Sequence, residues 1–249
     1  MAYVAVSALS HPGLLRERNE DSLAVGPWTL CATVTENPQT LVFPLGTPLA
    51  VAVADGLGGH PGGHLASSLT VRRIASLGPV LDSADAVREA LRDCNRAVFE
   101  AGRGAEGGDL TAMGTTVAGI VVQPESLLVF NVGDSRVFAH SPDGLRQMSV
   151  DDSPPLRPGQ RTTSMVTQCL GGSPGFQDVE PHVTAVPRTP GERYLLCSDG
   201  LTDPVPPEVV DEVLYEHDDG GAAFALWKAA IEAGGPDNIT VALVRTGDE

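Results

Sequence analysis

The chain has 249 residues, of which 42% are hydrophobic, so it can bury a sizeable core as one large domain or two small ones. Its 32 acidic and 16 basic residues give a formal net charge of −16, which would repel a phosphate backbone and argues against a nucleic acid partner. No apolar run could span a bilayer, and the start lacks the basic and apolar regions of a secretion signal. We therefore expect no membrane partner and a cytoplasmic protein.

The first 50 residues are predicted to alternate between strands and irregular segments. Residues 3–9 alternate as a strand does, and a loop dense in charge follows them. Another strand is expected from Ser22. Four prolines break residues 26–48 into short strands and turns.

A buried strand and two helices are predicted next. The apolar run 51–54 reads as a buried strand that stops at Asp55, where a glycine-rich turn leads into a helix over about 61–77. A second helix has apolar residues at helical spacing, and Ser83 is expected to cap its N-terminus. The glycine-rich residues 101–112 are expected to form a mobile loop.

The second half of the chain is predicted to be dense in strands. We expect an antiparallel meander of four closely spaced strands, at 115–122, 127–132, 136–140 and 144–148. An irregular loop, two strands, two helices and a last strand follow, at 149–165, 181–186, 193–198, 206–216, 221–233 and 239–244. This order predicts an α+β fold of layered sheets covered by helices.

Four carboxylates lie at the ends of predicted strands. Asp55, Asp134 and Asp199 each follow a strand, whereas Asp237 comes just before the last one. Each could be an ordinary turn residue, because Asp beside Gly is common in turns. If the strand ends converge at one rim, however, the carboxylates would repel one another strongly unless cations were bound between them.

Oxygen ligands of this kind suit Mg²⁺ or Mn²⁺. Zinc is less favoured, because no histidine or cysteine has the spacing of a zinc ligand. The four cysteines are scattered without a Cys-x-x-Cys pair, which favours buried free thiols in a reducing compartment.

Six short motifs occur in order between Gly13 and Thr240. They are Arg16-x-x-Asn19-Glu20-Asp21, Ala54-Asp55-Gly56, Gly114-Thr115-Thr116, Gly133-Asp134-Ser135-Arg136, Ser198-Asp199-Gly200-Leu201-Thr202-Asp203 and Asp237-Asn238-Ile239-Thr240. This series resembles the metal-dependent protein phosphatases of the 2C type, and its sequence is closer to the bacterial members than to the animal ones. Each motif alone is weak, but six in order are specific. They cover nearly the whole chain, so we expect a single catalytic domain over residues 1–249.

The resemblance implies an α-β-β-α sandwich of two antiparallel sheets flanked by helix pairs. It also implies hydrolysis of phosphoserine and phosphothreonine in proteins, with water activated by two metals attacking phosphorus in line. The partners would be proteins phosphorylated by a serine/threonine kinase. We expect the chain to be a monomer. The alternative is a regulatory binding module that keeps the fold without turnover.

The resemblance also assigns roles to individual residues. Asp55 would bridge two metals, with Glu20 and the carbonyl of Gly56 on one of them and Asp199 and Asp237 on the other. Asp134 matches a residue that some members use for a third metal. Arg16 matches the residue that holds the substrate phosphate, because its planar fork grips two oxygens; the alternative is a surface ion pair with Glu17 or Glu20. Asp21 matches an outer-shell residue, and Asn238 has no definite role.

The chain departs from the family pattern at two places near the site. Leu57 stands where many eukaryotic relatives have a histidine that acts as a general acid, so His60 becomes a candidate proton donor. The alternative for His60 is a cap or surface residue. Asp152 stands where bacterial members usually have histidine, at the start of a short, proline-rich flap.

Overall fold

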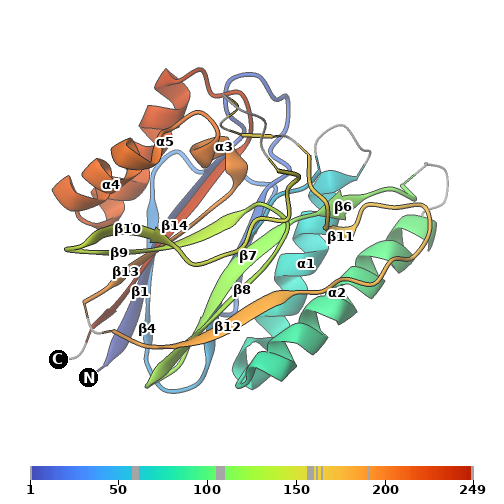
Figure 1. The fold of residues 1–249 in the computed structure, drawn as a ribbon, viewed down its shortest axis with the longest axis horizontal. Helices are drawn as coiled ribbons and strands as arrows, with labels where there is room; N and C mark the ends of the chain where they lie inside the picture. Colours follow the sequence, from blue (N-terminus) through green and yellow to red (C-terminus); the bar gives the residue numbers. More distant parts are fainter. Residues whose placement is uncertain are drawn as a thin grey trace.

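The structure is a computed structural model that describes residues 2–57, 62–104, 110–155, 160, 162–163, 165–189 and 191–247. Two six-stranded antiparallel sheets stack face to face, and helices cover both outer faces (Figure 1). The expected α+β class and the α-β-β-α sandwich are confirmed.

Both sheets combine strands from distant parts of the chain. The first has, in spatial order, β10 (Gly144–Gln147), β9 (Arg136–Ser141), β13 (Arg193–Cys197), β14 (Ile239–Gly247), β1 (Tyr3–His11) and β4 (Gln39–Pro44). The second has β12 (His182–Pro187), β8 (Ser126–Val132), β7 (Val117–Val122), β5 (Leu49–Ala54), β2 (Ser22–Val25) and β3 (Trp28–Cys31). A small two-stranded sheet pairs β6 (Gly114–Thr115) with β11 (Leu170–Gly171).

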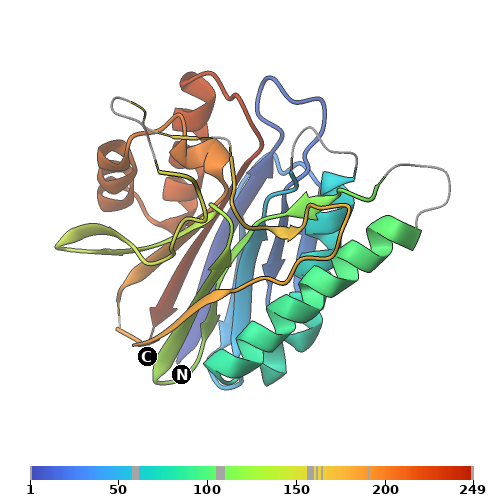
Figure 2. The same cartoon turned by 45° about the vertical axis from the view of Figure 1, so that its right-hand side comes forward.

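The helices form two layers that close the sandwich (Figure 2). The second sheet is covered by α1 (Gly63–Leu77) and α2 (Ala84–Gly104), which the short 3₁₀ turn Gly78–Val80 connects in part. The first sheet is covered by α3 (Asp199–Thr202), α4 (Pro207–Glu216) and α5 (Asp219–Glu232). No helix in the described part of the chain has both the length and the apolar composition that crossing a bilayer requires.

Strand β5 shows why the apolar run before Asp55 has no polar face. Ala50, Ala52 and Ala54 pack in the core beneath α1 and α2, whereas Val51 and Val53 pack between the two sheets. Because successive side chains of a strand point to opposite faces, a strand in a central layer is apolar at every position. The run of small and β-branched residues therefore encodes a strand buried on both sides.

Two local expectations were wrong. The segment from 115 to 148 is not one meander, because β8 belongs to the second sheet and β9 to the first. The chain crosses between the sheets at Gly133, whose φ of 102° suits glycine, so β8 and β9 never pair. The loop expected from residue 101 begins later, since α2 continues to Gly104; residues 105–109 lie outside the described part.

Helix starts agree with their sequence signals. The Ala86 amide donates to the Ser83 hydroxyl at 3.3 Å, which is the cap predicted for α2. Pro207 is the first residue of α4, where a missing N–H costs nothing. All four cysteines are unpaired; Cys94 and Cys197 are buried as expected, whereas Cys31 and Cys169 are partly exposed.

A carboxylate at the start of α5 is held by two arginines of the first sheet. Asp219 accepts from Arg193 Nε at 2.8 Å and from Arg245 Nε and NH2 at 2.8 and 2.9 Å. Arg193 also donates to the Leu214 carbonyl at the end of α4. Desolvation alone would raise the pKa of Asp219, but the hydrogen bonds and charges of both arginines outweigh it and hold that pKa below its usual value.

We expect Asp219→Ala to lower the free energy of unfolding at pH 7 by about 3 kcal/mol, the scale of leaving one member of a buried ion pair alone. The reason is that the Arg193 side chain is only 7% exposed and would lose its carboxylate. Because the folded pKa of Asp219 is depressed, this contribution is fully present above the usual aspartate pKa and disappears as pH falls through the folded value. Urea unfolding measures the loss, and exposed Asp143→Ala is the control; equal stability of the two variants would contradict the prediction.

Candidate metal and phosphate site

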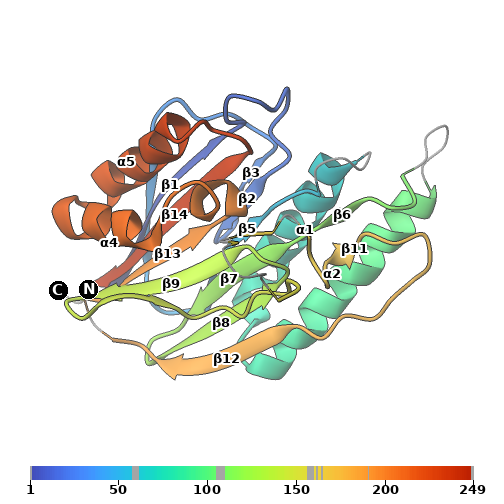
Figure 3. The ribbon, with the colours of Figure 1, turned by 45° about the horizontal axis from the view of Figure 1, so that its top comes forward.

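The four carboxylates predicted at strand ends come from both sheets. Asp55 and Asp134 follow β5 and β8 of the second sheet, and Asp199 and Asp237 flank β13 and β14 of the first. Figure 3 shows the N- and C-termini together at one end of the sheets. Asp199 and Asp237 lie toward the other end, because the end of β13 pairs with the start of β14, which pairs with His11 at the end of β1. The site is thus built between two sheets, not along the rim of one.

The backbone around Asp55 is fixed by close contacts. The Asp55 carbonyl accepts from the Thr116 amide at 2.9 Å, and the Gly56 amide donates to the Glu20 carbonyl at 3.3 Å. A Cβ on Gly56 would lie 2.5 Å from the carbonyl atoms of Gly63 at the start of α1, so only glycine fits there. The end of β5, the residue Glu20 and the start of α1 are therefore held in contact.

Asn238 holds the loop that carries Glu20 and Arg16. Its Oδ1 accepts from the Glu20 amide at 2.7 Å, and its Nδ2 donates to the carbonyls of Pro12 and Arg18 at 3.0 and 2.9 Å. The sequence analysis assigned no definite role to Asn238. The structure makes it the residue that joins the 12–20 loop to the start of β14.

Asp21 lies behind the surface of the site. It is 0% exposed, and its Oδ2 accepts from the Ser198 hydroxyl at 2.8 Å. Ser198 directly precedes Asp199, so Asp21 supports the segment that carries that carboxylate. The outer-shell role that the resemblance implied for Asp21 stays a prediction.

Arg16 forms an ion pair at the mouth of the site. Its NH2 donates to Asp237 Oδ2 at 2.6 Å, with the two side chains 43% and 33% exposed. The hydrogen bond to Asp237 raises the pKa of Arg16. The sequence alternative paired Arg16 with Glu17 or Glu20, whereas its partner here is a carboxylate of the site itself.

Burial and mutual repulsion act on the carboxylates together. Burial, followed by the charges of neighbouring carboxylates, raises the pKa of Asp55 well above its usual value and also raises that of Asp199. The same causes raise the pKa of Asp134 to about 7, and burial raises that of Asp21 to about 7 against the hydrogen bonds that it accepts. Asp55 and Asp199 lie within hydrogen-bonding reach of each other, which two ionised carboxylates avoid. Bound cations would therefore relieve the repulsion between these carboxylates.

The chemistry of this cluster fits divalent cations that prefer oxygen. The Oδ1 atoms of Asp21 and Asp199 are buried and have no hydrogen-bond partner among the described residues. Every side-chain donor is a carboxylate oxygen, which suits Mn²⁺ or Mg²⁺. As placed, no three His, Cys, Asp or Glu side chains of the described chain stand in a coordination arrangement, and Asp237 is turned toward Arg16.

Three further residues belong to the surroundings of the site. Asp203 lies one helical turn after Asp199, and burial and the Asp199 charge raise its pKa to about 6. Asp151 accepts from Arg136 Nε and NH2 at 2.9 and 2.7 Å. His64 Nδ1 lies 3.7 Å from Glu20 Oε1. Asp203 already stands in a motif quoted from the sequence, and its four-residue spacing from Asp199 is that of one helical turn.

His60, the candidate proton donor, lies outside the described residues. Leu57 is described, and its amide donates to the Gly114 carbonyl at 3.0 Å. A leucine side chain cannot donate a proton, so the departure from the eukaryotic pattern stands.

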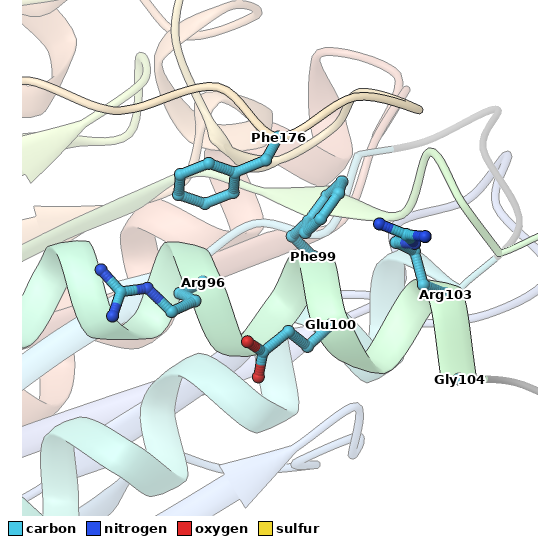
Figure 4. Close-up of a pocket in the computed structure, with 6 residues that line it drawn as sticks. All are labelled: Arg96, Phe99, Glu100, Arg103, Gly104 and Phe176. Atoms are coloured by element: carbon cyan, nitrogen blue, oxygen red, sulfur yellow. The ribbon is translucent and has the colours of Figure 1, made fainter.

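A separate hollow of about 520 Å³ lies along α2 and contains none of the acidic cluster. Figure 4 shows Phe176 over Phe99, with Arg96, Glu100 and Arg103 along the helix; the two phenylalanine rings meet edge to face at 5.3 Å. Its mixed charges and aromatic lining differ from the oxygen-rich cluster. The candidate metal ligands therefore lie at the strand ends, not in this hollow.

The family model described as protein phosphatase 2C matches residues 42–229. Among curated relatives, serine/threonine protein phosphatase PstP of Mycobacterium tuberculosis is 32% identical over 97% of this chain. The chain belongs to the protein phosphatase 2C family. Another relative, serine/threonine phosphatase stp of Listeria innocua, is 31% identical over 78% of this chain and 83% of its own length.

Solved structures of serine/threonine phosphatases share the fold. A crystal structure of Mycobacterium tuberculosis PstP has a TM-score of 0.80 and 30% identity, covering 99% of this chain and 100% of that one. The catalytic domain of PstP in complex with two manganese ions has a TM-score of 0.78 and 30% identity, with full coverage of both chains. This chain spans about half of the full curated PstP sequence, 45% of its length.

Proposed function

We propose that this chain is a metal-dependent protein phosphatase that hydrolyses phosphoserine and phosphothreonine in proteins. One observation carries the proposal: four carboxylates at strand ends of the two sheets lie close enough for their charges to act on one another, and Arg16 pairs with one of them, Asp237. Membership of the protein phosphatase 2C family supports it, as does a relative whose catalytic domain holds two manganese ions.

The residues divide the work according to their positions. We propose that Asp55 bridges two cations, with Glu20 and the Gly56 carbonyl on one and Asp199 and Asp237 on the other. Asp134 is proposed to bind a third cation. The charges of Asp199, Asp151 and Asp203 help to raise its pKa. Bound cations supply Lewis-acid activation of water and neutralise charge on the phosphate.

Arg16 is proposed to bind the phosphate of the substrate. Its guanidinium is partly exposed and charged, and a phosphate offers it the two oxygens that a planar fork can grip. Asn238 keeps the Arg16 loop in place through its three hydrogen bonds. A buried Asp21 orients the Ser198–Asp199 segment.

We propose that the described sandwich is one catalytic domain over residues 1–249 and that it acts as a monomer. Its substrates would be proteins phosphorylated by a serine/threonine kinase. We propose the cytoplasm as its compartment, because four scattered, unpaired cysteines are typical of reducing surroundings.

The purified chain is expected to release phosphate from a phosphothreonine peptide when Mn²⁺ or Mg²⁺ is added, and to stop when a chelator is in excess. Calorimetric titration with Mn²⁺ should show two tight sites, because Asp55, Asp199, Asp237 and Glu20 would supply their side-chain ligands. An exposed Asp143→Asn variant serves as the control. Cation binding without any phosphate release would support the regulatory-module alternative instead.

A further inference from the structure

Asp134 follows a turn that is hydrogen-bonded to a neighbouring segment, residues 149–152. At this turn, where the chain crosses between the sheets, Asn131 Nδ2 donates to the carbonyls of Gly133 and Val150 at 3.2 and 2.6 Å. In return, the Val150 amide donates to Asn131 Oδ1 at 3.1 Å. The segment 149–152 is thus bound side by side with the turn that precedes Asp134.

Asp152 completes this grip on both sides of Gly133. Its amide donates to the Gly133 carbonyl at 3.0 Å, and its Oδ2 accepts from the Gly133 amide at 2.8 Å. Both polar backbone groups of the residue before Asp134 are therefore bound to one amino acid. Gly133 itself cannot be replaced easily, because its φ is 102° and a Cβ would lie 2.6 Å from Thr116 side-chain atoms.

The same aspartate also ties the far end of its own loop. Asp152 Oδ2 accepts from Gln168 Nε2 at 3.0 Å, and the Asp152 carbonyl accepts from the Thr167 amide at 2.8 Å. The other oxygen, Oδ1, lies 2.8 Å from His182 Nε2 on β12. With only 12% of its side chain exposed, Asp152 joins the sheet crossover, both ends of the loop and β12.

We infer that Asp152 is a positioning residue for the reaction and acts by fixing the backbone from which Asp134 projects. Its carboxylate binds the Gly133 amide directly, so a change at Asp152 is transmitted through one residue to a carboxylate of the site. This inference rests on the proposed phosphatase function and adds a residue that touches neither phosphate nor cation. Supporting residues of this kind typically contribute 10–100-fold to metal affinity or activity.

The decisive experiment compares three single variants with an aryl phosphate and Mn²⁺. Asp152→Ala should lower kcat by roughly 10–100-fold, since the Gly133 amide loses its acceptor. Asp152→Asn should keep kcat within a few-fold of the wild type, because the amide oxygen of asparagine can still accept from the Gly133 amide. Its NH2 group can donate to Nε2 of His182 when the imidazole carries its proton on Nδ1. His182→Ala is the matched control, since it removes the partner of Oδ1 only and should leave kcat nearly unchanged.

A double-mutant cycle shows whether Asp152 acts through Asp134. If it does, Asp134→Asn combined with Asp152→Ala should have a kcat no lower than Asp134→Asn alone. Losses that multiply would overturn the inference, and so would an Asp152→Ala enzyme with wild-type kcat. If Asp152→Ala does not fold, Asp152→Ser takes its place, because its hydroxyl is too short to reach the Gly133 amide.

Amide hydrogen exchange tests the same contact without turnover. In protein without added metal, Asp152→Ala should speed exchange of the Gly133 and Asp134 amides. The free energy of global unfolding should fall by less than the free energy of local opening at these two amides. Asp152→Asn should restore their protection. Unchanged exchange at both amides would overturn the inference even if the wild type showed no phosphatase activity. A wild type without activity, but with this exchange pattern, would reject the proposed function alone.

Discussion

Replacing Asp55 by asparagine is expected to lower Mn²⁺-dependent turnover of a phosphothreonine peptide by at least about a hundredfold, the scale of losing metal activation of water. Asparagine keeps the size of the side chain but removes the charge at the centre of the cluster. The charges of Asp21, Asp199 and Asp237 all raise the pKa of Asp55. The two proposed cations would lose the ligand that they share.

Kinetics, calorimetry and thermal melting check this prediction. Single-turnover and steady-state kinetics give the loss in kcat, and Mn²⁺ calorimetry should show weaker binding at both tight sites. In chelator the Asp55→Asn protein should melt at a higher temperature than the wild type, because one of several repelling buried carboxylates is gone. Asp199→Asn should behave alike, whereas full activity in either variant would reject the two-cation assignment.

Arg16→Ala is expected to weaken kcat/KM by about 2–4 kcal/mol, the scale of losing one charge-assisted contact in the transition state. Arg16 stands at the mouth of the site, where its guanidinium is already drawn to an anionic oxygen of Asp237. A substrate phosphate offers the same guanidinium a pair of oxygens in a geometry that matches its fork. Removing the side chain should therefore affect binding of the phosphate and stabilisation of its charge.

Arg16→Lys should restore only part of the loss, since an ammonium group is a point charge and cannot make two parallel hydrogen bonds. The comparison uses one phosphothreonine peptide over a range of concentrations, so that kcat and KM are separated. Arg18→Ala, on the same loop, is the matched control for loss of positive charge. Wild-type kinetics in Arg16→Ala would mean that the Arg16–Asp237 contact is only a surface ion pair.

The sequence determined most elements and the positions of the carboxylates along them. Period-two patterns and apolar runs predicted β1, β2, β5 and β14, because burial of one or both faces of a strand is written in neighbouring residues. Asp55 and Asp199 could be placed at strand ends for the same local reason. The six ordered motifs were enough to indicate the family and the sandwich.

The tertiary structure alone decided which segments meet. The sequence pattern of β8 and β9 is that of neighbouring strands, yet a glycine with positive φ sends them to different sheets. Arg16 pairs with Asp237, 221 residues away, and not with the acidic residues beside it. Asp152 reads as a loop residue, but it holds the turn before Asp134. Periodicity records whether a side chain is buried, whereas the partner it meets depends on how distant strands are ordered in the sheets.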